Sequence, residues 1–248
     1  MKRRSLITLI FSLVLLSVFN SNQTIARITK SDKSISQVAK SASAKVDTAQ
    51  WKALFNGKDL TGWKQVGPGS HYVEDGLLKS HGGMGLLYWT GEKFGNCKIR
   101  VTFRMRDKNS NSGVFIRIPI EPREEWMPVH YGYEVQIDNN PELSNEDDYH
   151  YTGMLYSLTK PLAKTGKPGP EWNTMEITLD GPRTIVVLNG VKVTDFKEGD
   201  PVPDRKFDFE PFRGPRPLYG YMGLQNHGDN DVVFFKEVVV KPLNNKAK

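Results

Sequence analysis

From about residue 97 onward, hydrophobic and polar side chains alternate along the chain with a period of two. In residues 97–106 (CKIRVTFRMR), an aliphatic or aromatic side chain occupies every second position from Ile99 to Met105. Because successive side chains of a strand point to opposite faces, this pattern predicts β-strands. Comparable stretches rich in β-branched or aromatic residues cover 112–120, 131–138, 173–180, 184–196 and 231–240. No helical stripe extends beyond about ten residues, although 144–149 (SNEDDY) could start one helical turn.

Turn residues separate these predicted strands. Asp180-Gly181 and Asn189-Gly190 each lie between two of them, and such dipeptides are the strongest short-range signal for a β-hairpin. The pattern therefore predicts an all-β protein, folded as a two-sheet antiparallel sandwich of the jelly-roll type. Long loops in a compact domain often serve function, so four irregular stretches are of interest. They are residues 121–131, 139–151, 160–171 and 197–218.

Residues 131–138 (YGYEVQID) raise a question about the polar face of a strand. Tyrosine, valine and isoleucine share one face, whereas Glu134, Gln136 and Asp138 share the other. An antiparallel sheet permits such a face to meet solvent. Glutamic acid and glutamine are also suited to binding hydroxyl groups. The pattern alone leaves both readings open.

A second strand carries a similar face. In residues 111–117 (NSGVFIR), alternation places Asn111, Gly113, Phe115 and Arg117 on one side. An arginine fork binds planar or anionic oxygen groups. We expect this face and that of 131–138 to lie close together in one sheet.

The spacing of the acids limits the chemistry. Glu134 and Asp138 are four residues apart, which is ~13 Å along a strand. Glycosidases that use two carboxyl groups hold them ~5–5.5 Å apart when retaining and ~6.5–9.5 Å apart when inverting. These two acids therefore do not form an ordinary retaining pair.

Residues 223–231 (GLQNHGDND) frame a histidine with glycines and amides. His227 follows Gln225 and Asn226 and precedes Gly228. A histidine in such a loop can act as an acid or base near neutral pH, or it can simply bond its own turn. Trp172 presents a similar choice, because tryptophan at a sandwich rim stacks on a sugar face or fills the core.

No pattern indicates a metal or a cofactor. The other histidines are scattered without a ligand spacing. Residues 138–148 (DNNPELSNEDD) are dense in oxygen ligands, so calcium is conceivable, but they lack the spacing of an EF-hand loop and a solvated acidic loop is favoured. Residues 82–85 (GGMG) lack the Lys-Ser/Thr of a phosphate-binding loop. We therefore expect no metal and no cofactor.

The chain begins with a pattern typical of a secretory signal peptide. Residues 1–26 combine a basic start, an apolar run and a small residue at the end, and 27–50 are a polar spacer. These segments hold eight basic and two acidic residues of the chain's 34 and 28, which leaves 26 of each from Trp51 onward. A neutral domain speaks against nucleic acid as a partner. We expect a periplasmic or secreted protein, or one held at the cell surface, with no membrane span once the signal is removed; an uncleaved anchor is the alternative.

Several motifs fall in an order that resembles a known bacterial family. Residues 51–243 resemble the 3-keto-disaccharide hydrolase domain, long labelled DUF1080. The motifs that carry the resemblance are LFNGKDLTGW (54–63), YVEDGLL (72–78), NSGVFIR (111–117), YEVQI (133–137), TGMLYSL (152–158), EWNTMEI (171–177), LNGVKV (188–193) and GLQNHG (223–228).

The resemblance implies a fold similar to concanavalin A-like lectins and glucanases, and action on glycosides oxidised at sugar carbon 3. A 3-keto group acidifies the C2 proton, and removal of this proton lets the C1 substituent leave by elimination. One base and a group that stabilises the enolate oxygen therefore suffice for cleavage. On this basis Glu134 or His227 is expected to take the proton, with Arg117 stabilising the enolate. The sugar is expected to contact Asn111, Gln136, Tyr156, Trp172, Gln225 and Asn226.

One position departs from the family pattern. The family usually reads Leu-Gln-Asp-His-Gly where this chain reads LQNHG, so Asn226 replaces an acid. This departure keeps a second class of function in view, namely a non-catalytic carbohydrate-binding module that uses the same sheet. A third interpretation is a cell-surface adhesion domain, with the spacer as a tether. The fold does not decide among the three, because the same sandwich serves lectins and enzymes.

Overall fold

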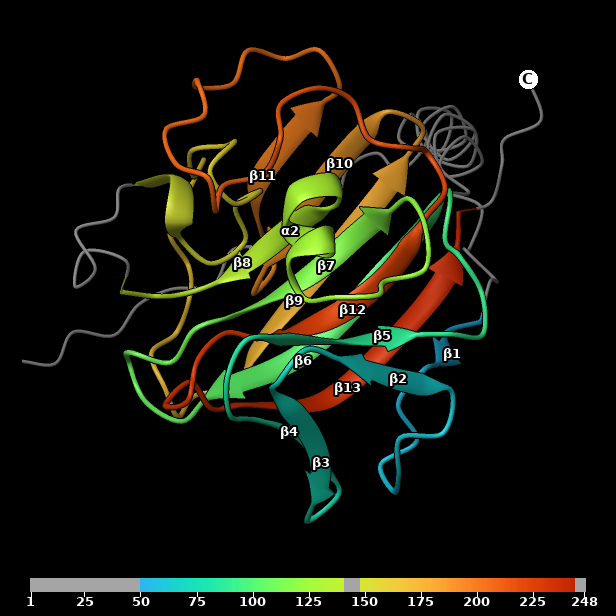
Figure 1. The fold of residues 1–248 in the computed structure, drawn as a ribbon. Coiled ribbons are helices and arrows are strands. Elements are labelled where there is room, and N and C mark those ends of the chain that lie inside the picture. Colours follow the sequence, from blue (N-terminus) through green and yellow to red (C-terminus); the bar gives the residue numbers. More distant parts are fainter. Residues whose placement is uncertain (1–49, 141–147, 244–248) are drawn as a thin grey trace, which may run out of the picture. The chain divides into compact units, whose positions relative to one another are not determined.

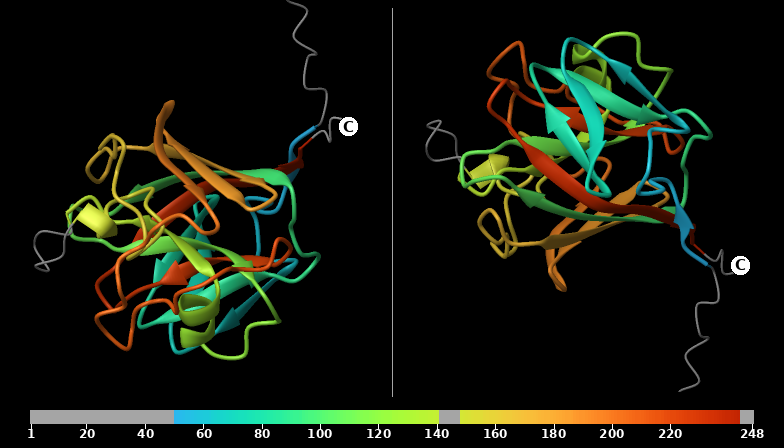
Figure 2. Two further views of the ribbon diagram at one scale, coloured as in Figure 1. Left: turned by 90° about the horizontal axis from the view of Figure 1, so that it is seen from above. Right: turned by 90° about the horizontal axis from the view of Figure 1, so that it is seen from below.

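The computed structural model describes residues 50–140 and 148–243. The predicted signal peptide, the spacer up to residue 49 and residues 144–147 of the expected helical turn lie outside these ranges. The described residues form two antiparallel β-sheets packed face to face, as the alternating pattern predicted (Figures 1 and 2). Within the described ranges, no helix is both long and apolar enough to cross a membrane.

The larger sheet has eight strands, and its order along the sheet is β11-β10-β9-β6-β13-β4-β3, with β1 paired to β13. Its strands are β1 (Lys52–Ala53), β3 (Ser70–Glu74), β4 (Leu77–His81), β6 (Cys97–Met105), β9 (Asn173–Asp180), β10 (Arg183–Leu188), β11 (Val191–Lys197) and β13 (Val233–Pro242).

The smaller sheet has five strands in the order β2-β5-β12-β7-β8. They are β2 (Trp63–Val66), β5 (Gly85–Trp89), β7 (Ser112–Ile118), β8 (Tyr133–Ile137) and β12 (Tyr221–Asn226). A short helix, α2 (Trp126–Tyr131), and a 3-10 turn, η2 (Asp148–His150), complete the described elements.

The main core lies between the two sheets and follows from the alternation. In β6, Ile99, Val101 and Phe103 are fully buried, whereas the residues between them are only partly buried. The facing strands of the smaller sheet contribute Val135 and Leu224 among others to the same cluster. Alternate positions thus supply one continuous apolar layer.

The two predicted hairpins are confirmed. Gly181-Pro182 joins β9 to β10, one residue later than the predicted Asp180-Gly181, because Asp180 is the last residue of β9 and pairs with Arg183. Asn189-Gly190 joins β10 to β11, as predicted. At the second turn both residues have positive φ angles, 52° for Asn189 and 84° for Gly190. Asparagine and glycine tolerate this left-handed conformation, which explains why that dipeptide marks a tight hairpin.

The smaller sheet is buried on both faces, unlike a simple solvent-facing sheet. Helix α2 covers part of its outer face, and Met127 and Val129 pack there against a second apolar cluster that includes Leu86, Tyr88 and Phe115. The expectation that residues 121–131 are irregular is therefore wrong for Trp126–Tyr131. A helix of six residues is too short to show a periodic stripe in sequence.

Candidate functional site

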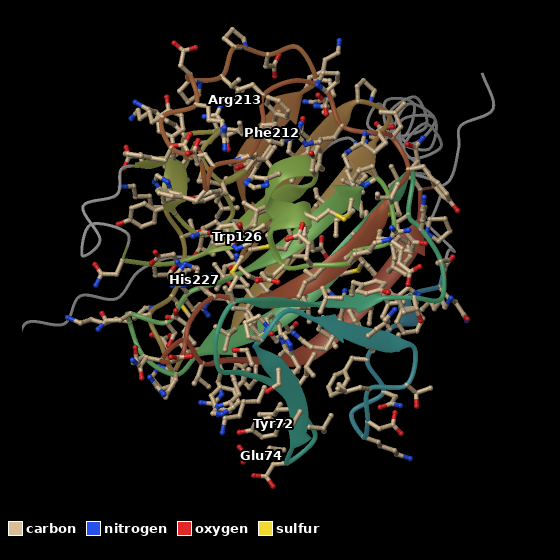
Figure 3. The ribbon with its side chains drawn as sticks, in the orientation of Figure 1. Tyr72, Glu74, Trp126, Phe212, Arg213 and His227 are labelled. Atoms are coloured by element: carbon tan, nitrogen blue, oxygen red, sulfur yellow. The ribbon has the colours of Figure 1, made fainter. Side chains whose placement is uncertain are left out.

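A pocket of about 260 Å³ opens on the outer face of the five-stranded sheet beside α2. Most of the predicted site residues line it: Asn111, Glu134, Gln136, Tyr156, Gln225 and His227. Figure 3 shows Trp126 and His227 on the same side of the molecule, over this sheet. Segments far apart in sequence therefore meet at one pocket.

The polar face of β8 looks into this pocket and not into bulk water. Glu134 is 6% exposed and Gln136 is 2% exposed. Their neighbours Tyr133, Val135 and Ile137 point the other way and belong to the main core. Alternation predicted this division correctly, and the open question of what the polar face meets is answered by a concave site.

Gly113 on β7 makes room for the Glu134 carboxylate. The two strands pair so that Gly113 lies opposite Gln136 and Phe115 opposite Glu134. A Cβ atom at position 113 would lie 2.2 Å from Oε1 of Glu134. Any larger residue at this position would displace the carboxylate, so the glycine of the NSGVFIR motif has a direct steric reason.

Two buried amide oxygens in the pocket have no protein partner. Oε1 of Gln136 and Oε1 of Gln225 are almost fully covered and accept no hydrogen bond from the residues that the structure describes, although both side chains line the pocket. Nε2 of Gln136 donates to Oδ1 of Asn111 at 3.4 Å, which fixes the orientation of that amide. A buried carbonyl oxygen without a donor is costly, so both oxygens are suited to accept a hydrogen bond from a ligand.

His227 begins the loop after β12 and is oriented by a carboxylate that the sequence analysis missed. Its Nδ1 lies 2.7 Å from Oδ2 of Asp231, and the other oxygen of Asp231 accepts a hydrogen bond from the Asn111 backbone at 2.9 Å. A proton on Nδ1 that faces this carboxylate leaves Nε2 as the basic nitrogen. The signal was available, because Asp231 closes the GLQNHGDND motif four residues after the histidine.

Arg117 does not share the pocket face, contrary to the expectation. It has a positive φ of 55°, and the pairing of β7 with β12 shifts register at this point. The irregularity turns the side chain toward the eight-stranded sheet, where it donates to the backbone oxygens of Gly181 (2.7 Å) and Pro217 (3.1 Å). A bulge breaks the alternation on which the expectation rested. Arg117 therefore ties the two sheets together.

Asn226 also lies outside the pocket. On β12, Gln225 points outward and Asn226 points inward, because neighbouring residues of a strand alternate. The Asn226 amide nitrogen donates to the backbone oxygens of Ser70 (2.6 Å) and His81 (3.2 Å), and its oxygen accepts from Nε2 of Gln65 (3.1 Å). The departure from the family's acid thus falls on a structural position.

Trp172 lies over the other sheet. Its ring stacks under the guanidinium of Arg104 at 5.3 Å and near the ammonium of Lys236 at 5.9 Å. Arg104 occupies a partly exposed position of β6, on the side opposite the core residues. The expected contact between Trp172 and the sugar site is therefore wrong, and so is the alternative that it fills the core.

The apolar wall of the pocket was not predicted. It comes from Met84, Trp126, Val129 and Phe209. Trp126 and Phe209 belong to the irregular stretches 121–131 and 197–218, which length alone marked as functional. Tyr156 was predicted as a site residue. It is held beside Glu134 because its backbone nitrogen donates to the backbone carbonyl oxygen of Glu134 at 2.9 Å.

The acids of the described residues do not form a metal site. Among residues 50–140 and 148–243, no group of three or more histidine, cysteine, aspartate or glutamate side chains is arranged to hold a metal ion. Asp138 is buried, and its Oδ1 accepts a hydrogen bond from the Asn140 backbone at 2.8 Å. It does not line the pocket, in agreement with the spacing argument against a carboxylate pair.

The fold defines the class of protein. The chain has a lectin-like sandwich fold: a protein of unknown function with a galectin-like fold from Bacillus subtilis matches with a TM-score of 0.55 and 11% identity, over 77% of this chain and 94% of that one. A crystal structure of a candidate glycosyl hydrolase from Parabacteroides distasonis ATCC 8503 matches with a TM-score of 0.64 and 26% identity, over 78% of this chain and 94% of that one. A second structure so described from that organism has a TM-score of 0.62 and 23% identity, over 78% and 100% of the two chains.

The chain belongs to the family of 3-keto-alpha-glucoside-1,2-lyase-like domains. The family model matches residues 50–241, nearly all of the sandwich. The family resemblance expected from the motifs is thereby confirmed, and so is the lectin-like fold that it implied. A comparison with curated proteins finds no match.

Proposed function

We propose that the protein cleaves glycosides whose sugar carries a ketone at C3, and that it does so in the pocket on the five-stranded sheet. The observation that carries this proposal is the combination at one pocket of an Asp-oriented histidine, a buried glutamate and two buried glutamine oxygens without a partner among the described residues. The membership in the 3-keto-glucoside lyase-like family supports the substrate class.

The reaction has three steps. A base removes the C2 proton, and the electron pair of the C–H bond is delocalised onto the C3 oxygen as an enolate. The enolate then collapses: a double bond forms between C1 and C2, the C1–O bond breaks, and the leaving oxygen takes a proton. Addition of water across the double bond gives the free 3-keto sugar. This chemistry needs one base and a polar environment for the enolate oxygen, without a pair of opposed carboxylates.

We assign the base to His227 and the second acid–base role to Glu134. Asp231 holds the ring in the tautomer whose Nε2 is basic, which is the arrangement that a general base requires. Glu134 lines the same pocket and is suited to deliver a proton to the leaving oxygen. The reverse assignment, with Glu134 as the base, uses the same two residues.

The amides supply the sugar contacts in this proposal. The free oxygens of Gln136 and Gln225 accept hydrogen bonds from sugar hydroxyls, since a hydroxyl is a donor of the right size. Asn111 and Gln136 are linked at 3.4 Å, and together they present amide groups to the ketone or enolate oxygen. Arg117, which lies elsewhere, has no part in this scheme.

A second candidate function is sugar binding without catalysis. The two unpartnered glutamine oxygens favour a ligand with hydroxyl groups, and this need is the same for a binding module and for an enzyme. The Asn226 substitution no longer argues for this reading, because Asn226 lies outside the pocket.

The test compares a 3-keto-glucoside with the unoxidised glucoside, with and without a chelator. Release of the leaving group from the keto form alone supports the proposed function. Binding of both sugars by calorimetry without release favours the binding module. Release that the chelator abolishes would place a metal in the reaction and contradict an acid–base mechanism that rests on His227 and Glu134 alone.

A further inference from the structure

Large aromatic side chains lie exposed beside the pocket. We use the name aromatic shelf for Trp126, Tyr131, Phe207, Phe209 and Phe212, whose exposed fractions run from 37% to 55%. Single exposed aromatic residues are ordinary, but a contiguous group is typical of a binding surface. Phe207 and Phe209 stack on each other with centroids 5.1 Å apart.

The shelf is built from two segments that hydrogen bonds hold together. The Phe212 backbone nitrogen donates to the backbone oxygen of His130 at 3.1 Å, and Nε2 of His130 lies 3.0 Å from the backbone oxygen of Asp208. The rings of the two segments also contact each other. The His130 ring stacks on both Trp126 and Phe212, with ring centroids 6.2 Å and 4.9 Å apart. The shelf is therefore organised before any ligand arrives, which lowers the entropic cost of binding.

The shelf continues one side of the pocket. Along the sheet, the row that contains Gly113 and Gln136 is polar, and the next row pairs Glu134 with Phe115. Phe115 already belongs to the apolar cluster under α2. From there the wall runs through Trp126 and Phe209, which line the pocket and also belong to the shelf. A ligand with its hydroxyl groups at Gln136 would extend its other end over these rings.

Backbone oxygens around the shelf are engaged with neighbouring groups. The backbone oxygen of Asp208 faces the His130 ring and also accepts a hydrogen bond from Arg205. The backbone oxygen of His130 accepts hydrogen bonds from the Phe212 backbone and from the Arg216 side chain. A second sugar on the shelf would find these backbone oxygens already bonded, and only the Tyr131 hydroxyl and the Trp126 indole nitrogen as polar groups of the shelf's own rings. An aromatic ring needs none and is favoured by stacking and apolar burial.

We propose that the aromatic shelf binds the leaving group of the glycoside and selects glycosides whose leaving group carries an aromatic ring. This inference rests on the proposed function for the orientation of the sugar. Phe209 and Trp126 are the residues that determine this specificity, because they belong to both the pocket and the shelf.

The test uses benzyl and methyl 3-keto-glucosides, whose leaving alcohols are similarly basic, together with a 3-keto-disaccharide. We expect the wild-type protein to favour the benzyl substrate in kcat/KM over both others. In Phe209→Ala, the benzyl-to-methyl ratio should fall roughly five- to tenfold, the range of a lost aromatic contact. Tyr219→Ala is the matched control, because Tyr219 is exposed but does not line the pocket; it should keep the ratio.

Two results would overturn the inference: a wild-type preference for the disaccharide, or a benzyl-to-methyl ratio that Phe209→Ala leaves unchanged. Calorimetry with the unoxidised benzyl and methyl glucosides separates this inference from the proposed function. If no keto-glycoside is cleaved but benzyl binding is tighter and depends on Phe209, the shelf stands and the proposed reaction is wrong. If cleavage occurs without any preference for the ring, the reaction stands and the shelf is wrong.

Discussion

The outer faces of the two sheets carry polar side chains in the same alternating pattern, yet their surroundings differ. On the eight-stranded sheet, Arg100 forks onto Glu237 with two contacts of 3.0 Å and lies over the ring of Trp51. On the five-stranded sheet, Oε1 of Gln136 and of Gln225 accept no bond from any described residue. On the first face, the partly exposed polar side chains bond to each other. On the second face, these two buried amide oxygens lack a hydrogen-bond partner among the described residues.

This difference separates a candidate ligand-binding face from a solvent-facing one. Both outer faces carry polar side chains at every second position, so polarity and periodicity do not decide which face binds a ligand. Burial and missing partners are informative when the atoms also line a pocket, because a ligand can then recover the free energy that a buried polar atom loses without a hydrogen bond. Buried atoms without a partner also occur away from the pocket, as at Oγ1 of Thr184. The following experiments test whether that distinction holds, in order of decreasing expected effect.

Glu134→Gln should abolish most of the turnover while preserving the fold. Loss of an acid–base group costs roughly 10²- to 10⁴-fold in kcat, and the amide occupies the same volume above Gly113. Glu237→Gln is the matched control on the other sheet. Its partly exposed ion pair with Arg100 should contribute less than about 1 kcal/mol to stability, and kcat should stay at the wild-type value. Steady-state kinetics and thermal unfolding measure both; equal losses of activity would erase the contrast between the faces.

Asn226→Asp, which restores the acid of the family pattern, should destabilise this protein. The carboxylate would face the backbone oxygens of Ser70 and His81, to which the amide now donates. We expect a loss of roughly 3 kcal/mol in the free energy of unfolding, since two donated bonds are replaced by repulsion at a buried site. Urea unfolding at pH 7 measures it, with Asn109→Asp at an exposed position as the control. A stable variant with raised activity would return position 226 to the site.

Asp231→Asn should lower kcat by roughly 10- to 100-fold, below the full value of a general base, and should alter KM much less. Asp231 contacts His227 at 2.7 Å and acts on the reaction through that ring. Asp231→Glu, which keeps the charge, should recover part of the rate. A change confined to KM, or a failure of the glutamate to rescue, would contradict a positioning role for Asp231.

His71 should make stability fall in weak acid. It is buried beside Gln65, with Nδ1 3.0 Å from the amide oxygen, and burial lowers its pKa to about 3. The unfolded chain takes up a proton near pH 6.5 that the folded protein refuses, so stability is lost as pH falls below that value. The slope is at most about 1.4 kcal/mol per pH unit.

The variant His71→Asn tests this effect, because asparagine keeps a donor toward Gln65 but does not titrate. Whatever the variant costs at pH 7, the stability difference between wild type and variant should shrink by about 2 kcal/mol at pH 5. Urea unfolding at both values gives the number. A difference that does not change with pH would show that His71 takes up its proton in the folded protein.

Local alternation predicted the parts of the fold that depend on neighbouring residues. It located β6 and β9, the hairpin at Asn189-Gly190 and the division of β8 into a core face and a pocket face. These features repeat within a few residues, so sequence carries them directly. The same rule would have separated Gln225 from Asn226, but the glycines around them concealed β12.

The wrong or missing predictions concern side chains whose positions depend on residues far away in the sequence. The turn of Arg117 depends on a register shift against β12 and on a close approach of Gly220, where a Cβ would lie 2.6 Å from the Arg117 backbone. The wall formed by Trp126 and Phe209 depends on bonds between segments about eighty residues apart in sequence, such as that of His130 with Asp208. No local pattern contains such information.

The central claim is that the pocket removes the C2 proton of a 3-keto-glycoside. The most direct test compares kcat/KM for a 3-keto-glucoside with hydrogen and with deuterium at C2. We predict a primary isotope effect in the wild-type protein, and loss of turnover in both Glu134→Gln and His227→Ala. Cleavage at equal rates for the two isotopes, together with turnover of the unoxidised glucoside, would contradict it.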